Sequence, residues 1–193
     1  MPVLARMEMS MPDGTKDEPP KKMLILRGTS GVREDEDGRA HNYQEGAMHV
    51  GAAKEYARRK GYVPVVLDLP GELGNHQHSK QTLRAKEMLH GDKSIKALYG
   101  FSGGGYSAFW IIRDMKSEDL DRLELLVVLG VETKHASQSS YEAAKFKDPK
   151  KHWTLVYRND PPKDNPAVKG QDAHMYGPEA LLAETPDPNK KKP

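Results

Sequence analysis

The chain has 193 residues and no cysteine, and its 30 lysine and arginine residues nearly balance its 28 aspartate and glutamate residues. That length is enough for one domain with a sizeable hydrophobic core and without stabilising metals or disulfides. The balanced charge gives no argument for nucleic-acid binding, because the excess lysines fall in short runs at residues 21–22 and 190–192, which are typical of solvated termini. The absence of cysteine excludes disulfides, thiolate chemistry and zinc–cysteine sites.

The chain carries no recognisable targeting or membrane signal. Its first residues lack the uninterrupted apolar core of a signal peptide, and no stretch reaches the about 18 apolar residues of a membrane-spanning helix. We therefore expect no membrane span and a cytoplasmic location. Residues 1–22 are predicted to form a polar N-terminal arm, residues 23–185 the folded domain, and the Lys/Pro-rich residues 186–193 a disordered tail.

Apolar runs and helical spacings alternate along the chain. In order, they predict a strand at 23–26, a solvated loop at 32–44, a helix at 45–60, a strand at 63–69, a turn at 70–75, a helix at 79–89, a central strand at 95–99, a helix at 106–112, a strand at 123–131, a helix at 137–146, a strand at 153–157 and a helix at 178–184. Pro64 places the start of the second strand at the rim of the sheet, and Ser79 is expected to cap the helix that follows. This pattern indicates an α/β fold, a small five-stranded, mainly parallel sheet with helices on both faces.

The central strand and its helix are joined by residues 100–104, Gly-Phe-Ser-Gly-Gly, which fit the motif Gly-x-Ser-x-Gly. In this motif the serine lies on a strained corner between strand and helix, and glycines are needed two residues to either side because side chains there would collide. The corner raises the Ser102 hydroxyl above the carboxyl ends of the strands. It also directs the Gly103 N–H group toward a developing oxyanion. Ser102 is therefore predicted to be a nucleophile; the alternative is a glycine-rich turn that only packs or binds a phosphate.

A nucleophilic serine needs a base, and the base needs a carboxylate that fixes its tautomer. Chemistry in an open parallel sheet collects at the carboxyl ends of the strands, and Asp160 and His174 both follow the last predicted strand. The chain order Ser102, Asp160, His174 is the order found in hydrolases with a Gly-x-Ser-x-Gly motif. Asp164 and Asp172 lie in the same loop and are the alternative acids.

Other polar residues near strand ends give weaker signals. His76 and His78 are spaced as two ligands of a metal site would be, but no carboxylate or third histidine stands at a suitable spacing. A polar loop is therefore the favoured interpretation. Asp68 and Glu72 follow the second strand and are expected to line the mouth of the site or to cap helices. We predict neither a metal nor a cofactor.

These motifs together resemble the cutinase family of serine esterases, the smallest members of the α/β-hydrolase fold. Cutinases begin with an apolar strand that ends in Arg-Gly-Ser-Thr, carry Gly-Tyr-Ser-Gln-Gly at the nucleophile, continue with a strand like Val-Val-Leu-Phe-Gly, and place a Gly-Asp turn and a His-x-x-Tyr-Gly stretch after the last strand. The similar stretches here are residues 26–30, 100–104, 127–130, 159–160 and 174–177. The resemblance covers residues 23–184, most of the chain.

The resemblance implies a catalytic triad of Ser102, His174 and Asp160. It also implies an oxyanion hole formed by the N–H of Gly103 with the N–H and hydroxyl of Thr29. Cutinases fasten the acid loop with a disulfide that this chain cannot make, and they carry glutamine where this chain has Gly103. The implied partner is a small-molecule ester.

The sequence leaves the substrate and one further class of function open. Few residues separate Gly130 from Trp153, which leaves little room for a lid and predicts an open site for short or solvent-accessible acyl chains. Thioesterase, carbohydrate deacetylase and cell-wall lipid esterase activities would use the same triad, because the fold sets the triad whereas loops choose the substrate. The alternative of another class is a non-catalytic α/β module that binds a phosphate or nucleotide at the glycines of residues 103–105.

Overall fold

A computed structural model gives the fold of the protein. It describes residues 18–28, 31–34, 40–43, 49–71, 76–131, 154–158 and 177–189. Within these ranges the chain folds as a parallel β-sheet with packed helices, which confirms the predicted α/β class. The predicted helix at 137–146 lies outside the described residues.

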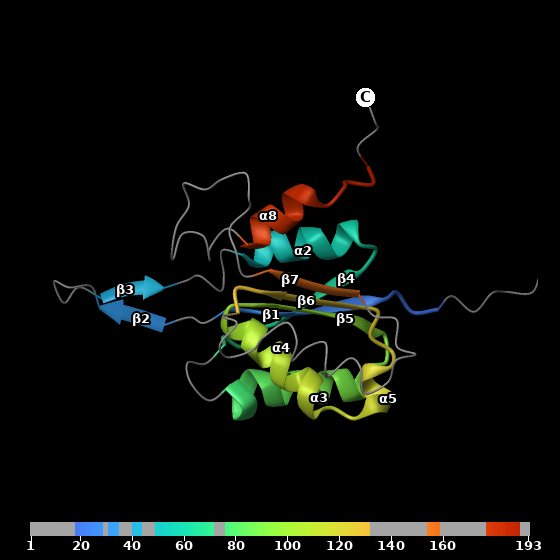
Figure 1. The fold of residues 1–193 in the computed structure, drawn as a ribbon, viewed down its shortest axis with the longest axis horizontal. Coiled ribbons are helices and arrows are strands. Elements are labelled where there is room, and N and C mark those ends of the chain that lie inside the picture. Colours follow the sequence, from blue (N-terminus) through green and yellow to red (C-terminus); the bar gives the residue numbers. More distant parts are fainter. Residues whose placement is uncertain are drawn as a thin grey trace, which may run out of the picture.

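The sheet places the central strand next to the first strand. Its strands are β1 (Lys22–Leu26), β4 (Val63–Leu67), β5 (Ile95–Phe101), β6 (Leu125–Leu129) and β7 (Thr154–Arg158). Their order is β4-β1-β5-β6-β7, and every neighbouring pair is parallel (Figure 1). Pro64 lies in β4 at one edge of the sheet, as predicted, where its missing N–H group leaves no interior ladder incomplete.

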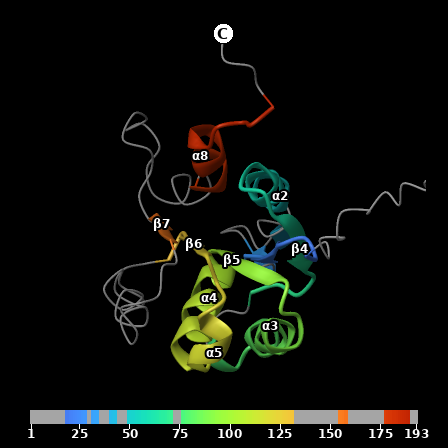
Figure 2. The same ribbon diagram turned by 90° about the vertical axis from the view of Figure 1, so that its right-hand side faces the viewer.

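Helices cover both faces of this sheet (Figures 1 and 2). On one face lie α2 (Val50–Arg59) and α8 (Gly177–Glu184). On the other lie α3 (Lys80–Gly91), α4 (Gly103–Asp114) and the short α5 (Ser117–Leu120). Ser79 caps α3 as predicted, since its hydroxyl oxygen accepts the N–H of Thr82 at 3.1 Å. Neither α5 nor the 3-10 turn η1 (His76–His78) was predicted.

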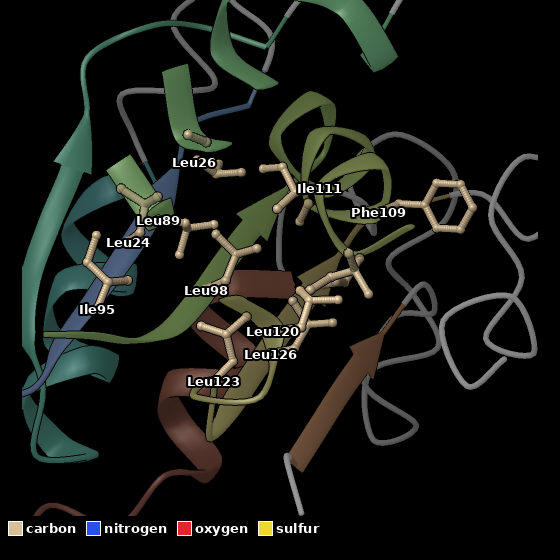
Figure 3. Close-up of a cluster of buried hydrophobic side chains, with 14 of the residues drawn as sticks. Leu24, Leu26, Leu89, Ile95, Leu98, Phe109, Ile111, Leu120, Leu123 and Leu126 are labelled. Atoms are coloured by element: carbon tan, nitrogen blue, oxygen red, sulfur yellow. The ribbon is translucent and has the colours of Figure 1, made fainter. Parts of the chain in front are cut away.

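Side chains alternate between two cores because successive residues of a strand point to opposite faces of the sheet. In β1, Leu24 and Leu26 pack toward α3 and α4 in the cluster of Figure 3. Met23 and Ile25 pack toward α2 and α8. All four are at most 1% exposed. Each such side chain contributes about 1.5–3 kcal/mol by leaving water, so both cores hold β1 in place beside β5.

The prediction of a solvated loop at 32–44 is wrong in part. Strands β2 (Gly31–Glu34) and β3 (Ala40–Tyr43) form an antiparallel pair there, with Gly31 opposite Tyr43 and Glu34 opposite Ala40. The prediction was based on the run of acidic residues between 34 and 37. An antiparallel ladder is held by backbone hydrogen bonds, which a charged sequence can form as well as an apolar one.

Candidate active site

Ser102 forms the corner between β5 and α4. Its backbone has φ 51° and ψ −121°, and no other non-glycine residue in the described ranges has a positive φ. The corner is fixed on both sides by backbone hydrogen bonds, because the Ser102 N–H donates to Leu129 O at 2.9 Å and the Ser102 carbonyl accepts the Tyr106 N–H at 3.1 Å. A non-glycine residue in this conformation is strained by about 1–3 kcal/mol and persists only where the surrounding structure enforces it.

The two motif glycines are required by close backbone contacts, as the motif predicts. A methyl group on Gly100 would place its carbon 2.7 Å from the carbonyl carbon of Gly104. One on Gly104 would lie 2.6 Å from the carbonyl oxygen of Arg27 and 2.7 Å from the carbonyl carbon of Leu26. These distances are shorter than carbon atoms tolerate, so α4 can approach β1 and β5 this closely only with glycine at both positions.

Two further glycines from distant loops close around the corner. A methyl carbon on Gly28, after β1, would lie 3.4 Å from Ser102 Cβ, and one on Gly71, after β4, would lie 2.8 Å from Gly103 Cα. The Gly71 N–H donates to Gly28 O at 3.1 Å, which joins the two loops. The buried Gln81 side chain also ties them, because its Nε2 donates to Arg27 O at 2.9 Å and Leu69 O at 2.7 Å.

Gly103 is the first residue of α4, where N–H groups lack partners within the helix and the helix dipole is positive. The structure therefore sets Ser102 next to a helix N-terminus that suits an anion. Ser102 is partly exposed, whereas Gly103 is buried. A hydroxyl on this corner has both solvent access and a nearby set of backbone donors.

The other predicted site residues lie outside the described residues. This holds for Thr29, Asp160 and His174, and for the alternative acids Asp164 and Asp172. The triad and the second oxyanion donor therefore stay predictions.

The two histidines that were predicted to lie in a polar loop form part of η1. The His76 ring stacks on Tyr106 with centroids 4.7 Å apart and an interplanar angle of 19°. Asp68 accepts a hydrogen bond from Arg27. Glu72 lies outside the described residues, and within the described part of the chain no group of three or more histidine, aspartate or glutamate side chains is arranged to hold a metal ion.

One histidine–carboxylate pair next to the corner was missed by the sequence reasoning. His49, at the start of α2, is 6% exposed, and its Nδ1 lies 2.9 Å and 3.0 Å from the two carboxylate oxygens of Glu179 in the first turn of α8. A carboxylate only accepts hydrogen bonds, so Nδ1 carries the proton. The pair joins residues 130 positions apart, a separation at which no sequence spacing could have indicated it.

Ser102→Gly is expected to raise the free energy of unfolding by about 1 kcal/mol, because glycine adopts a positive φ without strain. Urea unfolding followed by circular dichroism measures this change. A control is Ser94→Gly, at a position with no positive φ, which should not be stabilising. A Ser102→Gly protein that is less stable than the parent would show that the corner carries no strain.

No family model matches the chain, and no curated protein matches it significantly. In the described parts of the chain, no helix has the length and apolar character needed to cross a lipid bilayer.

Proposed function

We propose that the protein is a serine carboxylic-ester hydrolase with a cutinase-like, minimal α/β-hydrolase fold of five strands, and that Ser102 is its nucleophile. The observation that carries the proposal is the positive φ of Ser102 between a parallel strand and a helix. Strain of this kind is kept where function needs it, and a corner of this shape presents a serine hydroxyl at the carboxyl edge of the sheet. The packed glycines at 100 and 104 support the same reading.

The proposed mechanism is acyl transfer. His174, oriented by Asp160, takes the hydroxyl proton while Ser102 Oγ attacks the ester carbonyl carbon. The N–H groups of Gly103 and Thr29 stabilise the tetrahedral anion, and one such donor is typically worth about 3 kcal/mol. The anion collapses as His174 gives the proton to the leaving alcohol, which produces an acyl-enzyme. Water then attacks the acyl carbon and gives its proton to His174, which passes that proton to Ser102 Oγ as the acid leaves, so that the Ser102 hydroxyl and the neutral His174 are restored.

The proposed substrates are esters with short or solvent-accessible acyl chains. Thioesterase, carbohydrate deacetylase and cell-wall lipid esterase activities remain alternatives on the same residues, since the corner fixes the nucleophile and not the substrate. The alternative of another class is phosphate or nucleotide binding at the N-terminus of α4, which the glycines at its start favour.

Covalent labelling with a fluorophosphonate probe tests the proposal. The expected result is one probe molecule per chain on Ser102, mapped by peptide mass spectrometry, because such probes capture a serine only when a neighbouring base and anion donors activate it. Ser79 and Ser107 are internal controls, since both are at most 1% exposed. The hydrolase proposal would be falsified if Ser102 stayed unlabelled, and phosphate or ATP binding to that unlabelled protein would favour the alternative module.

A further inference from the structure

The side chain of Phe101, the residue before the proposed nucleophile, packs against His49. Phe101 ends β5, and the His49 ring packs edge-on against it with centroids 4.7 Å apart and an interplanar angle of 61°. Phe101 also approaches Gly28, where an added methyl carbon would lie 3.3 Å from Phe101 Cδ1. The ring therefore contacts both the start of α2 and the loop after β1, directly next to the strained Ser102.

His49 itself is fixed in place by α8. Both oxygens of Glu179 lie within 3.0 Å of His49 Nδ1, and a bond to a charged acceptor is stronger than a neutral one. Glu179 also acts on the neighbouring Tyr99 of β5, because burial and then the negative charge of Glu179 raise the pKa of that hydroxyl. One carboxylate thus joins α8 to α2.

Phe101 has space to move once His49 is shortened. A cavity of about 10 Å³ lies beside it and is lined by Gly28, His49, Tyr99 and Phe101 among others. Removing the imidazole would enlarge this space, and side chains around a new cavity relax part of the way into it. A shift of Phe101 would change the backbone of the next residue, Ser102, whose conformation is kept only by its surroundings.

We propose that His49, fixed by Glu179, is a positioning residue: it holds Phe101 and through it keeps the corner at Ser102 in shape. That this positioning serves catalysis rests on the proposed function. That His49 holds the corner in shape does not, because the hydrogen bond from the Ser102 N–H to Leu129 O can be followed whether or not the protein has any activity.

Amide hydrogen exchange in the full-length protein tests this role. In His49→Ala the Ser102 amide is expected to exchange about 10-fold faster than in the parent, because the corner opens more often. His49→Phe restores an aromatic edge against Phe101 and should bring the rate back to within about 3-fold of the parent. The Leu126 amide, in the buried strand β6 between β5 and β7, corrects for any change in global stability.

A second histidine–carboxylate pair, with a more exposed histidine, provides a control away from the corner. His90 Nδ1 lies 2.9 Å from Asp119, between α3 and α5 on the other face of the sheet. His90→Ala should leave the Ser102 amide unchanged after the same correction. The proposal is overturned if His49→Ala leaves the corrected Ser102 exchange rate at the parent value, or if His49→Phe exchanges as fast as His49→Ala.

The fluorophosphonate labelling rate separates positioning from catalysis. It is expected to fall about 10-fold in His49→Ala and to recover in His49→Phe, which cannot transfer a proton. Labelling as weak in both variants as in Ser102→Ala, with unchanged exchange, would make His49 the base and overturn the positioning role. If the parent does not label at all, the proposed function fails, whereas the exchange rates still decide whether His49 holds the corner.

Discussion

Replacing Ser102 by alanine is expected to lower ester hydrolysis by at least about 10³-fold, because the acyl-enzyme can no longer form. Alanine keeps the Cβ atom and with it the strain at φ 51°. The free energy of unfolding should therefore stay close to that of the parent, in contrast to Ser102→Gly. Initial rates with p-nitrophenyl acetate and butyrate, corrected for spontaneous hydrolysis, measure the loss. Turnover of the parent on these esters should exceed that on long-chain esters.

Ser107→Ala is the control for this substitution. Ser107 lies on the same helix, is fully buried, and its hydroxyl has no hydrogen-bond partner among the described residues. Removing an unpartnered buried hydroxyl costs little stability, and Ser107 has no place in the proposed mechanism. Its variant should keep the parent rate. A Ser102→Ala protein that hydrolysed these esters within a few-fold of the parent would exclude Ser102 as the nucleophile.

The corner at Ser102 was predictable because its determinants are local. An apolar strand, a serine flanked by glycines and an apolar helix follow one another within residues 95–112, and the sequence displays all three directly. The strand at 23–26 and the cap at Ser79 were predictable for the same reason. These features depend on neighbouring residues alone.

The surroundings of the corner were not predictable, since they join distant parts of the chain. Gly71 has no motif of its own, and Gly28 was noted only as part of the stretch 26–30, yet Gly28 packs against Phe101 and Ser102 and Gly71 packs against Gly103. His49 and Glu179 each look like ordinary helix residues until α2 and α8 lie side by side. Contacts of this kind depend on the order of the strands in the sheet, and the local patterns of a single sequence do not reveal that order.

Gly104→Ala is expected to destabilise the protein by about 3 kcal/mol, at the upper end of the usual cost of overpacking a core. The new methyl carbon would lie 2.6 Å from Arg27 O and 2.7 Å from the Leu26 carbonyl carbon. Both are backbone atoms at the end of β1, which is paired on one side with β4 and on the other with β5. The strand cannot move away without breaking a ladder, so α4 must shift and carry Ser102 and Gly103 with it. Urea unfolding measures the loss of stability.

Gly51→Ala supplies the opposite result from the same chemical change. Gly51 is also a helical glycine, in α2, but it is exposed and nothing lies within 4 Å of an added methyl group. Alanine there should stabilise the protein by about 0.5–1 kcal/mol, because a helical glycine loses more backbone freedom on folding than alanine does. Helix propensity alone predicts a gain at both positions, so the sign at Gly104 isolates the close contact between α4 and β1. Equal gains in stability in the two variants would mean that α4 does not approach β1 this closely. The close packing that explains the corner at Ser102 would then be absent.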